Sequence, residues 1–135
     1  MIRVPLHVLA DSANVSREGK LNLLGIFENI HAIGFPATHT ALALVFSIEA
    51  DTGDATREHD MVIDVVDSDG KSIANISGKL KFGQTTSGKV RSNQIIYFNG
   101  IQFGKPGTYE FKIIINGEER AFVPLELIEH KQPKQ

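Results

Sequence analysis

The stretch from residue 58 to residue 81 constrains the fold most, because two independent patterns in it predict the same strand pairing. Asp69-Gly70 is typical of a two-residue type I′ turn, since both residues tolerate positive φ. The alternation of apolar and polar side chains selects the same two faces. The sequence therefore predicts an antiparallel hairpin with one apolar face. Its expected pairs have numbers that sum to 139: Ile63 with Ile76, Val65 with Ala74, Met61 with Gly78, Asp60 with Lys79, and Glu58 with Lys81.

Length and composition bound the class of protein. A chain of 135 residues fits one domain, which we expect over residues 1–129, with a flexible polar tail over 130–135. It has no cysteine, which excludes a thiol nucleophile, a disulfide scaffold and any cysteine-ligated metal. We recognise no signal peptide, and no apolar run approaches the roughly 20 residues that span a bilayer. We expect a soluble, cytoplasmic protein.

The charge is unevenly distributed along the chain. The net charge of −2 argues against a nucleic-acid partner. Eight acids and one base lie between Glu49 and Asp69, whereas six bases and no acid lie between Lys71 and Lys105. This asymmetry fits a basic patch for an anionic partner, but cross-strand ion pairs within the hairpin explain it better. The surface-binding candidates are Asn14, Arg17, Lys89 and Arg91, of which Lys89 and Arg91 have no partner in the predicted hairpin.

The remaining segments also alternate with period two, and none is a convincing amphipathic helix. We predict an all-β, immunoglobulin-like antiparallel sandwich of about eight strands without substantial helix. One strand presents Leu42, Leu44, Phe46 and Ile48 on a single face. Another runs from Leu21 to about Ile30; its apolar residues change parity, which predicts a β-bulge near Leu24-Gly25.

Three further features refine this prediction. Residues 94–103 are apolar on both parities, which indicates a strand in the middle of a sheet or at a contact with another chain, whereas the Gly-, Ser- and Thr-rich residues 83–93 suggest a mobile loop. Pro5 and Pro124 suit edge strands. Tyr109, in a Pro-Gly-Thr-Tyr motif, is expected to form a tyrosine corner with a nearby backbone group.

The last hairpin offers two possible turns. Closing it in two residues at Asn116-Gly117 would put Ile113 opposite Arg120. A three-residue loop with a Gly bulge keeps one face apolar, and we therefore predict that loop. It aligns the parity of Tyr109, Phe111 and Ile113 with that of Ala121, Val123 and Leu125.

Two groups of polar residues suggest metal sites. Asp51, Asp54, Asp67 and Asp69 resemble paired calcium-binding loops, but the predicted strand order puts the two pairs at opposite ends of the sandwich, so turn chemistry explains them better. His31 and His39 share an end with Asp67 and Asp69, where two imidazoles and a carboxylate could hold zinc. Loop histidines are more often plain surface groups, and the sequence leaves open whether these two converge.

The sequence also gives little support for a group of catalytic residues. His7 and Asp11 lie on one face of a strand about 13 Å apart, too far for a hydrogen bond. Glu118 and Glu119 are adjacent and point to opposite faces, which is unsuitable for an acid–base pair. We therefore predict no catalytic, cofactor-binding or metal-binding residues, and no enzymatic activity.

Three segments of the N-terminal third stand out: Asp11-Ser12-Ala13-Asn14, Gly19-Lys20-Leu21-Asn22-Leu23-Leu24-Gly25-Ile26-Phe27 and Phe35-Pro36-Ala37. Together they resemble an uncharacterised bacterial family catalogued only as a domain of unknown function. The resemblance continues through the two later turn motifs and so spans most of the chain. It implies a small bacterial β-domain, and it carries over no catalytic residues. Asn14 and Asn22 could contact a ligand, but turn preferences explain them better.

These observations leave three functions open. The first is a non-catalytic binding or structural module that acts through its surface and self-associates or binds another protein. The second is a small-ligand or anionic-ligand domain that uses the loops around Asn14, Lys89 and Arg91. The third, a hydrolase or metal-dependent enzyme, has the least support.

Overall fold

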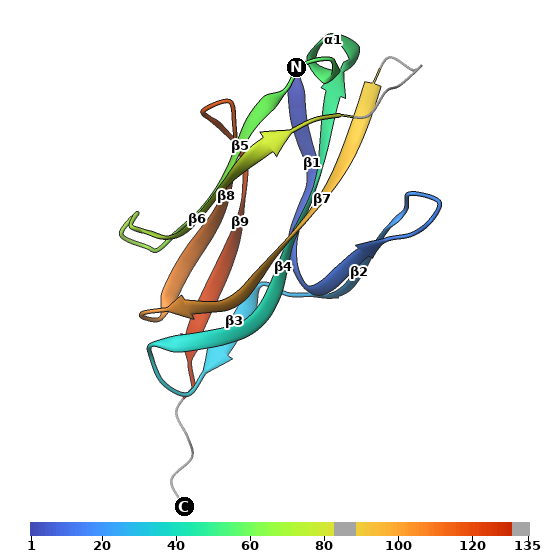
Figure 1. Cartoon of the computed structure of the whole chain (residues 1–135). Coiled ribbons are helices and arrows are strands. Elements are labelled where there is room, and N and C mark those ends of the chain that lie inside the picture. Colours follow the sequence, from blue (N-terminus) through green and yellow to red (C-terminus); the bar gives the residue numbers. More distant parts are fainter. Residues whose placement is uncertain (83–88, 131–135) are drawn as a thin grey trace, which may run out of the picture.

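Two β-sheets face each other in the computed structural model, which describes residues 1–82 and 89–130 (Figure 1). The elements are β1 (Ile2–Val15), β2 (Leu21–Ile26), β3 (Asn29–Ala32), β4 (Ala37–Asp51), α1 (Thr52–Ala55), β5 (His59–Val66), β6 (Ser72–Leu80), β7 (Lys89–Phe103), β8 (Gly107–Ile115) and β9 (Glu118–Glu129). One sheet has the order β2-β1-β4-β7 and the other β3-β9-β8-β5-β6. The predicted all-β sandwich is confirmed, with nine strands in the described part instead of about eight.

The core lies between the inner faces of the two sheets. The predicted apolar face of β4 is fully buried from Leu42 to Ile48. It meets the inward side chains of β8, among them Tyr109 and Phe111. Burying each such side chain contributes about 1.5–3 kcal/mol. The predicted tyrosine corner is confirmed, because the buried Tyr109 hydroxyl donates to the carbonyl oxygen of Lys105 at 2.6 Å.

The β5–β6 hairpin has the predicted pairs but not the predicted turn. Ile63 lies opposite Ile76, Asp60 opposite Lys79, and Glu58 forms an ion pair with Lys81 at 3.3 Å. The two-residue type I′ turn is wrong, because in the described residues only Asn116 has positive φ among non-glycines. The loop instead has three residues, closed by the Asp67 N–H donating to the Lys71 carbonyl at 2.9 Å. A register shift next to Val65 restores the predicted pairing.

The β8–β9 hairpin shows the reverse combination. Phe111 lies opposite Val123 and Tyr109 opposite Leu125, as predicted. The predicted three-residue loop is wrong: Asn116 and Gly117 have φ of 53° and 82° and form a two-residue turn. A register shift between Ile113 and Ile114 then keeps the apolar face continuous. In both hairpins the apolar face determines the register in the middle of the strands. A register shift of one residue near the turn then connects that register to the turn that forms.

The predicted strand from Leu21 to Ile30 is two strands in different sheets. β2 pairs with β1, and β3 pairs with β9 in parallel, so the expectation of antiparallel pairing throughout is wrong. The predicted bulge near Leu24-Gly25 is also wrong, because β1 and β2 keep one register from Ala10–Ile26 to Val15–Leu21. Leu24 and Ile26 are exposed, so no change of face is needed.

β7 is an edge strand, so its predicted place in the middle of a sheet is wrong, while the alternative, a contact with another chain, stays a prediction. Gly100 has a φ of 70°, and both Phe98 before it and Ile101 after it are buried. A local reversal of facing at Gly100 thus explains why Phe98 and Ile101 differ in parity, whereas Tyr97 is exposed on the other face of the strand. β7 already begins at Lys89, so residues 89–93 are strand and not loop. The rest of the predicted mobile loop, residues 83–88, lies outside the described residues.

The two prolines lie in β1 and β9, which are interior strands, so their prediction as edge-strand residues is wrong. Each nevertheless sits in a part of its strand that has only one partner. β2 pairs with β1 only from Ala10 onward, and β3 pairs with β9 only from Glu126 onward. Pro5 and Pro124 therefore remove donors where no neighbour needs them.

The chain end is held further than expected, because the N–H of His130 donates to the carbonyl of Ala32 at 2.7 Å. Residues 131–135 of the predicted tail lie outside the described residues. Within residues 1–82 and 89–130 no helix has the length and apolar character to cross a membrane.

Candidate functional site

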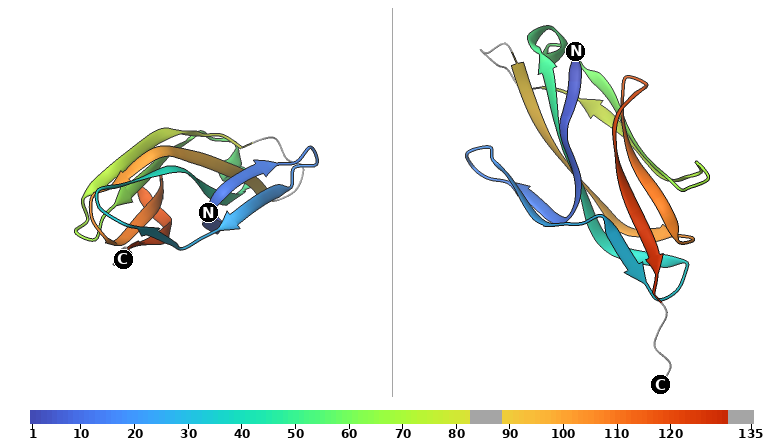
Figure 2. Two further views of the ribbon diagram at one scale, coloured as in Figure 1. Left: turned by 90° about the horizontal axis from the view of Figure 1, so that it is seen from below. Right: turned by 180° about the vertical axis from the view of Figure 1, so that it is seen from behind.

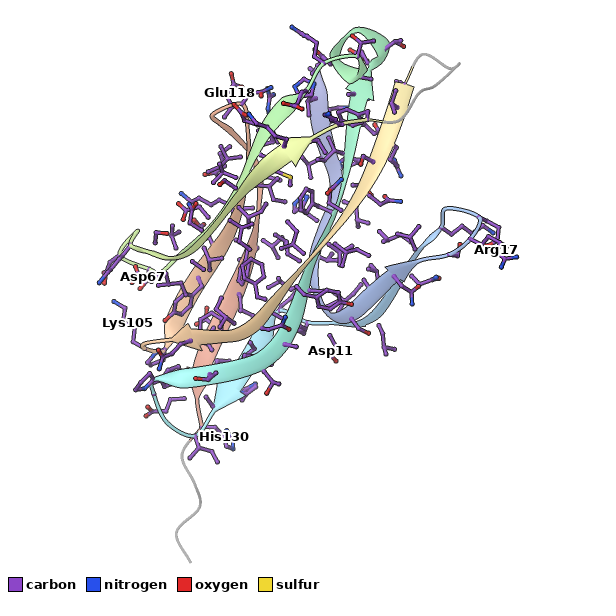
Figure 3. All side chains as sticks on the ribbon, in the orientation of Figure 1. Asp11, Arg17, Asp67, Lys105, Glu118 and His130 are labelled. Carbon is purple, nitrogen blue, oxygen red and sulfur yellow. The ribbon has the colours of Figure 1, made fainter. Side chains whose placement is uncertain are left out.

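The predicted surface-binding residues fall into two separate places. Asn14 and Arg17 lie on the hairpin of β1 and β2, and Arg17 marks its outer tip (Figure 3). Asn14 accepts a hydrogen bond from the side chain of Asn22 at 2.9 Å. Lys89 and Arg91 lie at the start of β7, beside the end of β4. The four residues do not form one site.

Arg91 is not the unpaired cation that the sequence predicted. Its guanidinium forms an ion pair with Glu49, and Arg3 contacts the same carboxylate at 3.0 Å. These bonds, from Arg91 first and Arg3 second, hold the pKa of the Glu49 carboxyl below its usual value. Lys89 lies opposite Asp51 in the strand register. The basic residues at the start of β7 therefore lie beside acidic residues at the end of β4. This arrangement is a cross-strand pairing of opposite charges, like the one predicted for the hairpin.

The two candidate histidines do not converge. The ring of His31 lies 6.0 Å from that of His130, and the ring of His39 lies 6.1 Å from that of Phe27. No group of three or more His, Asp or Glu side chains in the described residues has a geometry that could hold a metal ion.

The four aspartates lie in two groups at opposite ends of β5. Asp67 accepts the N–H groups of Lys71 and Asp69, each at 2.9 Å, and these bonds, led by that of Lys71, lower the pKa of its carboxyl. Asp54 contacts the Met1 amine at 2.5 Å and Arg57 at 2.7 Å, which lowers its pKa in the same order of importance. The predicted turn chemistry is thus confirmed for Asp67, whereas Asp51 and Asp54 bind the N-terminal amine instead of capping a turn with their side chains.

His59 is a buried histidine that sequence reasoning missed. Its Nε2 lies 2.6 Å from the Asp54 carbonyl oxygen and its Nδ1 lies 2.9 Å from Asn116 Nδ2. These contacts assign the proton to Nε2, which donates, while Nδ1 accepts. Asn116 also accepts the N–H of Asp60 at 2.9 Å. Both imidazole nitrogens are committed to joining β5 to α1 and to the β8–β9 turn, which makes this histidine structural.

A polar pocket of about 420 Å³ lies over His59. Its cations are already paired, Arg57 with Asp54 at 2.7 Å and Arg120 with Glu118 at 3.1 Å. An anion would have to displace those carboxylates. Its other lining residues are Met1, Ile2, Glu58 and Asn116.

The most distinctive surface is the hairpin formed by the outer half of β1 and by β2, which we call the projecting hairpin (residues 10–26). It extends away from the sandwich in both side views (Figures 1 and 2). Three large apolar side chains are exposed on it: Val15 by 48%, Leu24 by 69% and Ile26 by 58%. Ile26 also borders a smaller cleft of about 180 Å³ between β1 and β9, beside the exposed Phe122.

Tyr97 attaches the projecting hairpin to the sandwich. Its hydroxyl donates to the carbonyl of Ala13 at 2.9 Å and accepts the N–H of Ala13 at 3.0 Å. This replaces the strand partner that β1 loses where β4 diverges after Ala10. The hairpin is therefore held in place, and its apolar residues stay exposed.

The sequence contained a pattern that indicates this surface, but we interpreted that pattern as a bulge. Leu24 and Ile26 have the opposite parity to Leu21 and Leu23. That conflict indicates a strand with apolar side chains on both faces, which the core can cover on one side only.

The comparisons with known proteins place the chain in a family without giving an activity. No curated protein matches it. It is similar in structure to alkylpurine DNA glycosylase AlkC from Pseudomonas fluorescens bound to abasic-site DNA, with 16% identity over 94% of this chain and 30% of that one and a TM-score of 0.43. It is also similar to a β-glucosidase from Listeria innocua in complex with isofagomine, with 9% identity over 98% of this chain and 17% of that one and a TM-score of 0.50.

The chain thus spans less than a third of either solved structure, and the likeness to the β-glucosidase is one of fold alone. The sequence match is more informative. A model of a family of unknown function, DUF6941, matches residues 5–128, which is nearly the whole chain, and the protein belongs to that family.

Proposed function

We propose that this protein is a non-catalytic interaction module that associates with another polypeptide through the projecting hairpin, and that it forms a homo-oligomer. The observation that carries the proposal is the exposure of Val15, Leu24 and Ile26 on one element that extends from the sandwich. Leu24 and Ile26 lie two residues apart on one face of the hairpin, whereas Val15, which pairs with Leu21, lies on the other face. Adjacent exposed apolar side chains such as Leu24 and Ile26 mark interaction sites more often than they persist uncovered. A cytoplasmic location belongs to the same proposal, and fractionation of expressing cells tests it.

The energetics fit a weak, reversible interaction. Covering an exposed leucine or isoleucine contributes about 1.5–3 kcal/mol. Association itself costs at least about 4 kcal/mol in lost translational and rotational freedom. The free energy gained by covering two or three such side chains on each chain exceeds that cost only modestly. We therefore expect a dissociation constant in the micromolar range or weaker.

The polar groups support a non-catalytic role because their bonds are structural. His59 uses both ring nitrogens within the fold, and the Glu49 carboxylate is held by two arginines. A general base needs an available lone pair and a suitable pKa. Nδ1 of His59 is occupied by Asn116, and the two arginines lower the pKa of the Glu49 carboxyl, which makes it a weaker base.

Sedimentation velocity over a wide concentration range tests the proposal. The wild type should rise above its monomer mass of 14.8 kDa as concentration increases. The double variant Leu24→Ser/Ile26→Ser should associate at least tenfold more weakly, because each change removes more than 1.4 kcal/mol of buried apolar surface. Ile33→Ser/Ile76→Ser is the matched control, since these side chains are exposed by 66% and 37% outside the hairpin. A wild type that remains monomeric at every concentration would contradict the proposal.

A further inference from the structure

The free edge of β2 carries backbone groups that no strand among residues 1–82 and 89–130 satisfies. Ser16 and Lys20 are hydrogen-bonded across the turn at 2.7 Å. Hydrogen-bonded and non-hydrogen-bonded pairs alternate along an antiparallel ladder, so Asn14–Asn22 is the next bonded pair, while Val15–Leu21 and Ala13–Leu23 are not bonded. The Tyr97 contact supports this, because the Ala13 groups point away from β2. The N–H and C=O groups of Leu21 and Leu23 therefore point outward.

β2 differs from the other sheet edges that the structure describes. Edge strands are normally protected by charge, proline or short length. β7 carries Lys89 and Arg91, β6 carries Lys79, and β3 is four residues long. β2 is six residues long, Leu-Asn-Leu-Leu-Gly-Ile, with neither charge nor proline. Its edge is open to another strand.

We infer that β2 pairs antiparallel with β2 of a second copy of this chain, with Leu21 opposite Leu23 of the other copy and Asn22 opposite itself. This inference rests on the proposed function and names the partner and the register. The two leucine pairs then exchange the outward N–H and C=O groups of Leu21 and Leu23 on both strands. The result is one continuous sheet that runs through both copies.

The chemistry of β2 suits a copy of itself better than a different strand. Residues at a two-fold axis meet their own kind, so a charged residue there would repel its copy. Asn22 is an amide, which both donates and accepts and is therefore self-complementary. It gives one hydrogen to Asn14 and retains its oxygen and its second N–H for the other copy. A register centred on Leu23 instead would put Leu21 opposite Gly25, whose φ of 71° interrupts the ladder.

The inferred register also covers the exposed leucine. Pairs across the axis have numbers that sum to 44, so Leu24 lies opposite Lys20 of the other copy. The alkyl stem of a lysine can cover apolar surface while its ammonium stays in water. Both side chains are exposed in the single chain.

A charge exchange between positions 20 and 24 tests this register. Sedimentation velocity on the full chain should show that Leu24→Lys lowers the dimer fraction by at least tenfold in association constant, because two ammonium groups then face each other. Adding Lys20→Glu should restore at least half of the lost association, since the new carboxylate faces the new ammonium across the axis. Within one chain these positions lie about 13 Å apart along the strand, too far to pair. Ile33→Lys adds the same charge outside β2 and should leave dimerisation unchanged.

Leu23→Pro tests the backbone separately. It removes an outward N–H that makes no bond to another described residue, so circular dichroism and melting temperature should stay near those of the wild type while the dimer is lost. If Leu23→Pro unfolds the chain, the variants Leu24→Lys and Lys20→Glu alone test the inferred pairing.

A wild-type dimer that survives both Leu24→Lys and Leu23→Pro overturns the inferred β2 pairing, while self-association of the chain still stands. Loss without restoration by Lys20→Glu overturns the register. A wild type that stays monomeric overturns both the inference and the proposed self-association.

Discussion

The β1–β2 and β5–β6 hairpins have the same turn but opposite surroundings. In the first, Ser16 and Lys20 close the loop around Gly19, whose φ is 85°. In the second, Asp67 and Lys71 close it around Gly70, whose φ is 81°. In both turns the side chain of the first residue accepts the N–H of the closing lysine.

The strands that flank these turns differ in what they pack against. β5 lies between β6 and β8, and Ile63 and Val65 are fully buried. The outer half of β1 has left β4, and its partner β2 exposes Leu24 and Ile26. Equal local structure thus produces one hairpin that stabilises the core and one that presents apolar surface. The role of a hairpin depends on its packing and not on its turn.

The largest expected difference between the two hairpins is in stability. Ile63→Ala should lower the free energy of unfolding by about 2–5 kcal/mol, because it leaves a cavity in the core. Leu24→Ala should change the free energy of unfolding of the monomer by no more than about 0.5 kcal/mol, because the side chain is 69% exposed. Chemical denaturation at low protein concentration measures both values. Similar costs for the two changes would show that the projecting hairpin packs as tightly as β5.

A smaller effect concerns the attachment of the projecting hairpin. Tyr97→Phe removes the hydroxyl that bonds both backbone groups of Ala13, and we expect a loss of about 1 kcal/mol. Hydrogen exchange should accelerate at the Ala13 amide more than at core amides. Tyr109→Phe is the control, since its hydroxyl bonds Lys105 and should not affect Ala13 selectively. Unchanged exchange at Ala13 would mean that Tyr97 does not hold the hairpin.

The smallest expected effect is a difference in how the stability of the two turns depends on pH. Asp67 has a pKa lowered below its ordinary value of 3.8, mainly by the Lys71 N–H, whereas Ser16 in the equivalent position does not titrate. A carboxyl with a depressed folded pKa stabilises the fold above its ordinary pKa and loses that contribution as pH falls through the folded value. The melting temperature of the wild type should therefore decline more steeply below about pH 3.8 than that of Asp67→Ser. Parallel curves would contradict the assigned role of Asp67.

The two core hairpins show how far the fold could be predicted from the sequence. The pairs Ile63–Ile76 and Phe111–Val123 were predicted correctly, because a slip by one residue would expose every apolar side chain on the strand. Both turn types were predicted incorrectly. Asp69-Gly70 and Asn116-Gly117 are similar dipeptides, and a bulge next to either one can shift the register by one residue at modest cost.

The candidate site was predicted less well than the fold. Arg91 was expected to be unpaired, but pairing of β4 with β7 brings it to Glu49, 42 residues away in sequence. Leu24 and Ile26 were expected to change face through a bulge, whereas they remain exposed on a strand that departs from the sandwich. Period-two alternation indicates which face of a strand is apolar, but it does not show whether a second sheet covers that face.

The sequence alone determined the all-β class, the inner faces of β4, β5 and β8, and the tyrosine corner, because alternation and short-range turn chemistry are local properties. Only the tertiary structure decided that β2 and β3 belong to different sheets, that β7 is an edge, and that the β1–β2 hairpin projects. These features depend on which distant strands compete for each backbone edge and each apolar face. That competition is settled by packing over the whole chain, and no single segment encodes its outcome.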